Sequence, residues 1–290
     1  MRLPCFRRAA FPLALALALA LPVAALAHDV DTLGKIRTAG QINVAYSPDS
    51  IPFSATIDGK PGGYSIDLCQ GVIAAIGRAV GNPALRVNWI PGTVSERLAA
   101  VKAGRADLEC ANTTTTVSRM ADVDFSNLVF VDSAGFLVRT DGPIQSMADF
   151  AGKRIGVIAG TTNEKRIAAV LKDRGVEATL VTVHDGPEGT AMLEARTLDV
   201  FVGDRVKLVG LLVTAKDPKA LSMLLADFSY EPYAFALPRG DSSLRLVVNR
   251  ELTRVFVTRD IEAIFSRWLG ALGRPGSLLS AMYLLSAVPD

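Results

Sequence analysis

Cysteine and histidine are scarce in this sequence of 290 residues, which contains three cysteines and two histidines. These residues do not follow the spacing of a zinc site, and no GxSxG, Walker or GxGxxG motif occurs. The sequence therefore gives no support for a metal site, a hydrolase triad or a nucleotide-binding loop, and we expect no metal and no cofactor. His184 is expected to be a strand-end residue rather than a base.

The sequence also lacks an excess of charge of either sign. Its 31 basic and 29 acidic residues give a formal charge of +2, so no basic surface for nucleic acid is expected. Half of the residues are hydrophobic and only 21% are charged, which is the opposite of the composition of disordered chains. The length is enough for one large domain or two medium lobes.

Long hydrophobic runs are confined to the N-terminus, where residues 1–27 have the pattern of a secretory signal peptide. The basic residues that open this segment are Arg2, Arg7 and Arg8. Pro12 and Pro22 interrupt the apolar run, which falls short of the ~20 residues that a membrane span needs. Cleavage after Ala27 would remove three arginines and no acid, so the formal charge would become −1. We expect no membrane insertion after cleavage.

Only Cys69 and Cys110 would remain after cleavage, because Cys5 lies in the leader. An even pair of cysteines in an oxidising compartment is a candidate disulfide. Two buried free thiols are the alternative, because cysteine also packs as a small hydrophobic residue. The Cα separation decides between them.

Beyond residue 40 the sequence alternates between short apolar strands and amphipathic helices. Strands are predicted at residues 41–46, 85–90, 106–111, 129–131, 153–158, 179–183 and 200–202. Helices are predicted at residues 65–80, 95–103, 163–174, 187–196, 205–215, 242–269 and 278–285. This alternation is typical of an α/β fold in which helices cover a mostly parallel sheet.

The alternation occurs twice, which predicts two α/β lobes rather than one barrel. We expect the C-terminal helices to return to the first lobe, which makes that lobe discontinuous. The predicted boundaries are residues 28–133 with 232–290 for lobe 1, and residues 134–231 for lobe 2. Two strands that cross between the lobes would form a hinge.

The most distinctive polar segment is residues 109–119, where four consecutive threonines follow a predicted strand. A short helix is predicted to start near Val117, with Arg119 in its first turn. Exposed N–H groups at a helix start favour an anion, and a guanidinium can bind both oxygens of a carboxylate. The segment therefore predicts a carboxylate-binding site, and a threonine that merely caps a helix is the alternative.

Two further segments predict the opposite side of the same site. Residues 160–162, Gly-Thr-Thr, follow a strand and open a helix, so their amides and hydroxyls could approach an anion. Asp204 lies at the carboxyl end of a strand, where ligands of open α/β sheets bind, and its carboxylate could bind an ammonium group. Helix capping is the alternative role for both segments.

The order and spacing of these features resembles the bacterial periplasmic amino-acid-binding proteins of ABC importers (solute-binding family 3), especially the glutamate/aspartate-binding branch. The matching pieces are residues 32–36, 51–54, 63–69, 104–107, 109–110, 113–114, 124–126, 160–162 and 264–268, with Arg97, Arg119 and Asp204. The resemblance implies a type II periplasmic-binding-protein fold whose two lobes close on one amino acid. It also implies a periplasmic monomer that delivers this ligand to an inner-membrane ABC permease.

The resemblance assigns roles to residues by their position in the sequence. Arg119 would bind the α-carboxylate of the ligand, and Asp204 would bind its α-ammonium group. Three polar residues would assist Arg119, namely Asn112, Thr114 and Thr161. Phe53 would pack on the ligand from lobe 1.

The far end of the expected pocket departs from the acidic-amino-acid branch. By alignment, Ser47, Ile158 and Gly186 stand where that branch has an arginine, a hydroxyl residue and a histidine. Arg97 is the remaining candidate for a cation at this end. Because a buried carboxylate without cations is poorly compensated, glutamate and aspartate are not favoured over a polar, neutral or apolar amino acid or another small acid.

A periplasmic dehydratase acting on arogenate-like or prephenate-like acids is the alternative function on the same fold. It would need a general acid in the cleft. The nearby candidates are Glu164, Asp185 and Glu188, and all three have the sequence positions of helix-start residues.

Overall fold

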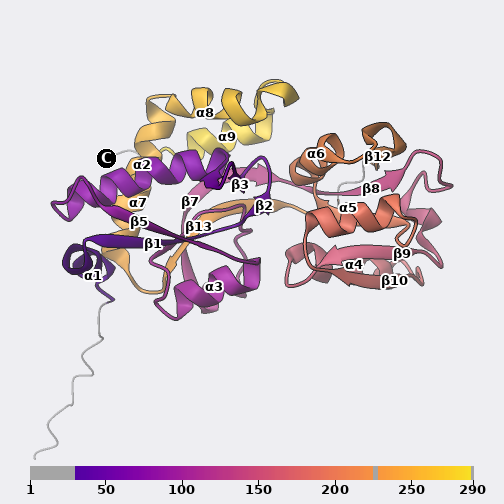
Figure 1. The fold of residues 1–290 in the computed structure, drawn as a ribbon, viewed down its shortest axis with the longest axis horizontal. Coiled ribbons are helices and arrows are strands. Elements are labelled where there is room, and N and C mark those ends of the chain that lie inside the picture. Colours follow the sequence, from indigo (N-terminus) through magenta and orange to yellow (C-terminus); the bar gives the residue numbers. More distant parts are fainter. Residues whose placement is uncertain (1–29, 225–227, 289–290) are drawn as a thin grey trace, which may run out of the picture.

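The computed structural model describes residues 30–224 and 228–288, so the predicted signal peptide at residues 1–27 lies outside the described residues. The chain forms two five-stranded sheets, each with helices packed against it, which lie next to each other along the long axis of the molecule (Figure 1). We call the unit around the sheet nearer the N-terminus lobe 1, and the other unit lobe 2.

The sheet of lobe 1 has the strand order β5-β1-β6-β13-β7. β1 (Gln41–Tyr46) pairs in parallel with β5 (Arg86–Pro91) and β6 (Leu108–Glu109). β13 (Glu231–Pro238) runs antiparallel to β6 and to β7 (Val123–Asp132). A small separate sheet consists of β2 (Asp49–Ser50), β3 (Ser54–Ile57) and β4 (Lys60–Gly62).

Helices cover both faces of the lobe 1 sheet. Its helices are α1 (Thr32–Ala39), α2 (Tyr64–Ala79), α3 (Val94–Lys102), α7 (Ser242–Val257), α8 (Asp260–Leu269) and α9 (Ser277–Ser286). The apolar face of α2 lies in one core with buried residues of α7, α8 and α9, so the C-terminal helices pack on lobe 1 (Figure 1). α3 covers the other face through a smaller core of mostly small side chains.

The sheet of lobe 2 has the strand order β10-β9-β11-β8-β12. Its strands are β8 (Ala134–Arg139), β9 (Arg154–Ile158), β10 (Thr179–Val183), β11 (Val200–Asp204) and β12 (Leu221–Leu224). Its helices are α4 (Thr162–Asp173), α5 (Gly186–Glu194) and α6 (Arg205–Thr214). Two apolar clusters lie on this sheet, one built around Phe136 and Ile155 and the other around Leu137 and Phe201.

The chain crosses between the two sheets in two places. β7 continues into β8 with one residue between them, and the chain returns between the end of β12 and the start of β13. The strands that follow the crossings, β8 and β13, run antiparallel to both of their neighbours. Each sheet therefore has two parallel and two antiparallel pairings, and the prediction of mostly parallel sheets is wrong in this respect.

Two predicted helices differ from the observed ones. The helix predicted at residues 242–269 is divided into α7 and α8 at Arg259, whose φ of 63° is left-handed. The helix predicted to start near Val117 is only a three-residue 3₁₀ turn, η1 (Arg119–Ala121). The other 3₁₀ turns are η2 (Met147–Phe150), η3 (Pro218–Ala220) and η4 (Gly270–Leu272).

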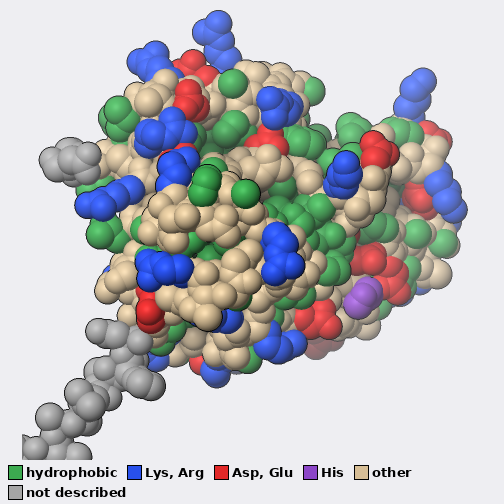
Figure 2. All heavy atoms as spheres, turned by 60° about the vertical axis from the view of Figure 1, so that its left-hand side comes forward, with side chains coloured by type: hydrophobic (Ala, Val, Ile, Leu, Met, Phe, Trp, Pro, Cys, Tyr) green, Lys and Arg blue, Asp and Glu red, His purple; other side chains and the backbone are tan. Residues whose placement is uncertain are grey.

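Charged side chains of both signs are distributed over the face shown in Figure 2, which among the described residues carries no continuous basic surface. Within residues 30–224 and 228–288, no helix combines the length and apolar character needed to cross a membrane.

Candidate functional site

A cavity of about 250 Å³ lies between the lobes and is lined by residues of both. This volume is smaller than the roughly 300–1,000 Å³ of cavities that bind drug-sized ligands, so the cavity suits a small metabolite. Six of the seven predicted ligand-binding residues line it, namely Arg97, Asn112, Thr114, Arg119, Thr161 and Asp204. Phe53 does not.

Arg119 reaches across the cavity from lobe 1. Its Nη1 donates to the carbonyl oxygen of Thr114 at 2.7 Å, and its Nη2 lies 3.4 Å from the carbonyl oxygen of Gly160 in lobe 2. Partial burial lowers the pKa of Arg119, and the nearby carboxylate of Glu109 opposes this effect. The expected helix dipole is absent because η1 is a single turn, so the guanidinium is the group that this segment could offer to an anion.

Asp204 ends β11 and is the residue before α6, yet its side chain caps no helix N–H group. Its two carboxylate oxygens accept hydrogen bonds from Asn112 of lobe 1 at 3.2 Å and from Asn163 of lobe 2 at 2.7 Å. Burial, and then the negative charge of Glu231, raises the pKa of Asp204. A cation placed beside Asp204 would relieve this cost of burial.

Asn163 is a site residue that the sequence reasoning missed. It lies in the first turn of α4, is 5% exposed and lines the cavity. Its Nδ2 is bound to Asp204, whereas its Oδ1 has no hydrogen-bond partner among the described residues. A buried, unpaired acceptor beside a carboxylate is suited to an ammonium group. The only signal in the sequence is a polar residue that follows Gly-Thr-Thr.

Glu231 is a second residue that was missed, and it is 2% exposed at the start of β13. Oε2 accepts hydrogen bonds from the hydroxyls of Thr114 in lobe 1 at 2.6 Å and Thr162 in lobe 2 at 2.7 Å, while Oε1 accepts one from Ser229 at 2.7 Å. The Thr114 hydroxyl proton is therefore committed to Glu231, so this oxygen can accept from a ligand but does not donate to a carboxylate. In the sequence, the one feature that could have indicated Glu231 is its place as a single acidic residue at the start of an apolar strand.

Thr161 has the capping role that was the alternative at the sequence level. Its hydroxyl donates to the carbonyl oxygen of Ile158 at 2.7 Å and accepts from the N–H group of Glu164 at 3.3 Å. Because this hydroxyl already donates one hydrogen bond and accepts another, Thr161 caps the N-terminus of α4 and has no free hydroxyl proton for a ligand.

Arg97 lies in the cavity wall but is not a free cation. Its Nε donates to Glu109 at 2.8 Å, and its other nitrogens reach the carbonyl oxygen of Gly92 and the hydroxyl of Thr113. Both members of the Arg97–Glu109 pair are buried within lobe 1. The charge that was expected to face a distal group of the ligand is therefore balanced inside the protein.

The prediction that Phe53 packs on the ligand is wrong for this structure, since Phe53 has no exposed surface. Its ring packs edge-on against Tyr64, Phe130 and Tyr233, with ring centroids 4.8–6.0 Å apart. This aromatic cluster fills the interior of lobe 1, so Phe53 supports the wall without reaching the cavity.

The cavity has two ends. We call the end with Arg119, Asp204, Asn112 and Asn163 the proximal end. We call the part of the wall with Ser47, Asp49, Ile158 and Lys207 the distal end. Lys207 lies three residues after Asp204, and its charge also acts on Asp204. Gly186 does not line the cavity, and a Cβ added to it would lie 2.9 Å from a methyl group of Leu211, so that this side chain would have to shift.

The three candidate general acids all accept hydrogen bonds from backbone N–H groups at helix starts. Glu164 accepts from Gly160 at 2.8 Å, Asp185 from Glu188 at 2.8 Å, and Glu188 from His184 at 2.6 Å. Of these acids only Asp185 lines the cavity. Their structural roles are those of helix-start residues.

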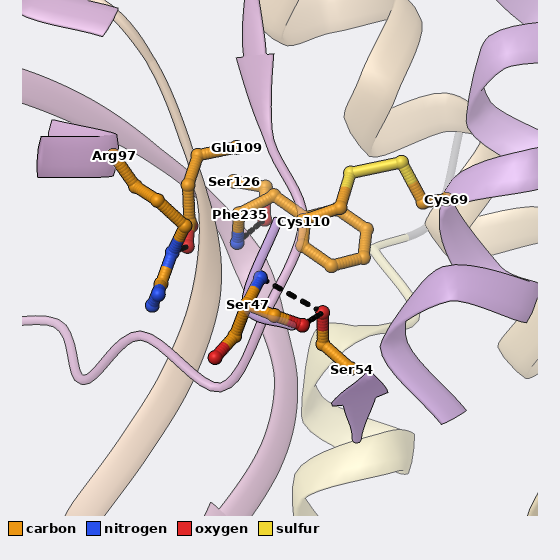
Figure 3. Close-up of a disulfide and its surroundings, with 8 residues drawn as sticks. All are labelled: Ser47, Ser54, Cys69, Arg97, Glu109, Cys110, Ser126 and Phe235. Atoms are coloured by element: carbon orange, nitrogen blue, oxygen red, sulfur yellow. Dashed lines mark hydrogen bonds and ion pairs between the residues drawn. A yellow bond between two sulfur atoms is a disulfide. The ribbon is translucent and has the colours of Figure 1, made fainter. Parts of the chain in front are cut away.

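Cys69 and Cys110 form a disulfide that joins α2 to the end of β6, with Cα atoms 6.1 Å apart. Figure 3 shows this bond beside Phe235, with the Arg97–Glu109 pair and the Ser47–Ser54 hydrogen bond nearby. Because Cys110 directly follows Glu109, the disulfide fixes the strand that carries one side of the site. Among the described residues, no group of three or more potential metal ligands is suitably arranged.

Two lobes, two crossings and a polar cavity between the lobes define a class of ligand-binding protein, and comparison with known proteins agrees. The profile of bacterial extracellular solute-binding proteins, family 3, matches residues 42–271. An L-glutamate/L-aspartate-binding protein from Pseudomonas aeruginosa is 31% identical over 239 residues, which are 82% of this chain and 79% of that protein. The chain belongs to the family 3 bacterial extracellular solute-binding proteins.

Solved structures confirm the two-lobed periplasmic-binding-protein fold. An ABC transporter periplasmic binding protein from Brucella ovis, with glutathione bound, aligns with a TM-score of 0.72 and 26% identity over 79% of this chain and 72% of that chain. An ancestral amino acid-binding protein, a precursor of cyclohexadienyl dehydratase, aligns with a TM-score of 0.70 and 25% identity over 82% and 99%. Curated relatives are named for amino-acid binding and transport, which supports a binding protein over the dehydratase alternative.

Proposed function

We propose that this chain is the periplasmic solute-binding component of an ABC amino-acid importer, and that its two lobes close on one free amino acid. The observation that carries the proposal is the placement of Arg119 and Asp204, two opposite charges that line one cavity between the lobes. A zwitterion places a carboxylate and an ammonium group on one carbon, so two opposite charges facing one small cavity suit it.

In this proposal each charged group of the ligand has its own partners. Arg119 binds the α-carboxylate, with the N–H groups in the first turn of α4 also directed at an anion. Asp204 binds the α-ammonium group, which also donates to the Thr114 oxygen and to Oδ1 of Asn163. Asn112 holds the Asp204 carboxylate in place from lobe 1.

Closure is supported by groups that touch both lobes. Arg119 contacts the carbonyl of Gly160, and Glu231 holds hydroxyls from each lobe. We propose lobe boundaries at residues 133/134 and 231/232, with a hinge at the two crossings. The mature chain would begin at residue 28, act as a monomer in the periplasm, and deliver its ligand to an inner-membrane permease.

A thermal-shift screen of the mature protein against the amino acids and small dicarboxylates tests this function. A ligand at 100 times its dissociation constant should stabilise the protein by about 2.7 kcal/mol. The α-hydroxy acid analogue of the best ligand lacks the ammonium group and should give a much smaller shift. A screen in which no amino acid stabilises the protein would contradict the proposal.

A further inference from the structure

The distal end of the cavity holds an acid and a base from opposite lobes. Asp49 lies on β2 of lobe 1, and Lys207 lies in the first turn of α6 in lobe 2. Both line the cavity and both are half-buried. The two groups interact electrostatically, yet their charged atoms are not within the 4 Å of a salt bridge. The carboxylate and the ammonium group are therefore not directly paired.

Lys207 is an unusual residue at its position. A cation in the first turn of a helix is disfavoured by the helix dipole. Among the described residues, no carboxylate oxygen lies within 4 Å of its Nζ, and no hydrogen bond of this nitrogen is formed. A half-buried ammonium group with these properties is available to a ligand as a hydrogen-bond donor.

Asp49 is fixed in its ionised form as a hydrogen-bond acceptor. The Ser47 hydroxyl donates to Oδ1 at 2.8 Å, and the N–H group of Gly186 in lobe 2 also interacts with the carboxylate. Burial alone would raise the pKa of Asp49, but Lys207, Ser47 and the N–H group of Gly186 together lower it. Its carboxylate therefore lines the cavity as a hydrogen-bond acceptor.

The other charged groups of the cavity are engaged elsewhere. Arg97 is paired with Glu109. Glu96 accepts hydrogen bonds from Thr93, and Asp185 accepts from Glu188. The remaining titratable group of the wall, His184, is exposed at the mouth. Asp49 and Lys207 are thus the charged groups of the distal end that no salt bridge engages.

We infer that the distal end selects an amino acid with an uncharged side-chain amide, the class of glutamine and asparagine. This inference rests on the proposed function. An amide nitrogen would donate to Asp49, while the amide oxygen would accept from Lys207. A carboxylate side chain would meet the repulsion of Asp49, and an ammonium or guanidinium side chain would meet that of Lys207.

Calorimetric titration of the mature protein with L-glutamine, L-asparagine, L-glutamate, L-arginine and L-leucine tests the inference. Either amide should bind at least about tenfold tighter than the other three amino acids, because a like charge or an unpaired polar group costs more than 1.4 kcal/mol. Tightest binding of glutamate, arginine or leucine would overturn the inference and leave the proposed function intact. Binding of none of the amino acids would contradict the proposed function itself.

Two isosteric or near-isosteric variants separate the roles of the pair. Asp49→Asn should improve glutamate relative to glutamine, and Lys207→Met should improve arginine relative to glutamine, each by about tenfold. Asp58→Asn and Lys172→Met are matched controls, because both residues are exposed and away from the cavity. Unaltered preferences in Asp49→Asn and Lys207→Met, with thermal unfolding like that of the controls, would overturn the inference.

Discussion

The proximal and distal ends of the cavity are built differently. At the proximal end, contacts between the lobes are already formed: Asp204 receives hydrogen bonds from both lobes, and Glu231 holds a threonine from each. At the distal end, Asp49 and Lys207 line the cavity without a salt bridge between them, and the N–H group of Gly186 in lobe 2 interacts with Asp49 of lobe 1. Hydrogen-bonded charges at the proximal end suit the groups that all amino acids share, whereas an acid and a base without a salt bridge suit the side chain that differs among them.

The largest effect is expected at the proximal end. Arg119→Ala should weaken the binding of every amino acid, by about 2–5 kcal/mol, because it leaves a buried ligand carboxylate without its partner. Calorimetry against the best ligand and two weaker ones measures this loss. Arg166→Ala, on the exposed surface of α4, is the matched control. An unchanged affinity, or a loss confined to one amino acid, would refute the distinction between the two ends.

Removing the disulfide should lower the stability of the protein more than it weakens ligand binding at the proximal end. Cys69→Ala combined with Cys110→Ala should lower the free energy of unfolding by about 2–4 kcal/mol, because the unfolded chain gains the freedom of a long loop. Urea unfolding of the variant and of the wild type measures the difference. Binding at a temperature where the variant is folded should remain close to wild type. Equal stability of the two proteins would contradict this prediction.

Glu231 should contribute to stability and to ligand binding because it orients two threonine hydroxyls. Glu231→Ala leaves the Thr114 and Thr162 hydroxyls without their acceptor, and we expect a loss of roughly 1–3 kcal/mol in stability and weaker ligand binding. Glu231→Gln retains an oxygen that can accept from both threonines, so it should restore most of the affinity. The comparison uses calorimetry at one temperature. Equal binding by the alanine variant and the wild type would remove Glu231 from the proximal end.

The smallest effect concerns Asp132, which lies behind the proximal end at the close of β7. Burial, and then the charge of Asp204, raises its pKa to about 7. The folded state therefore holds a proton that the unfolded state loses above about pH 4, so this group destabilises the fold as pH rises towards 7. Asp132→Asn cannot ionise, and its melting temperature relative to wild type should be higher at pH 8 than at pH 5. A difference independent of pH would contradict the assignment.

Much of the fold could be predicted because its signals are local. The apolar face of α2 and the strand β1 follow from the spacing of hydrophobic residues, and both are observed within one or two residues of their predicted limits. The division of residues 242–269 at Arg259 was not predictable, because it depends on packing against lobe 1. The antiparallel strands were missed because alternation with helices does not indicate how a crossing strand enters a sheet.

Some residues of the site could also be predicted from the sequence, whereas others could not. Arg119 and Asp204 could be proposed from residue type and strand ends, and the structure places both at one cavity. Asn163, Glu231 and Lys207 have no distinctive motif, and they become site residues only because two distant segments meet. Phe53 shows the converse: its position in the sequence suited a ligand contact, yet three aromatic rings enclose it.

The sequence by itself therefore determined the α/β alternation, the candidate charges for a zwitterion and the family resemblance, because each is encoded in residues near one another or in their order along the chain. The tertiary structure decided which charges are free. Arg97 is neutralised by Glu109, whereas Lys207 and Asp49 line the cavity from opposite lobes without a salt bridge between them. The pairing of buried charges depends on distances between segments that the chain brings together only on folding, and local sequence does not encode those distances.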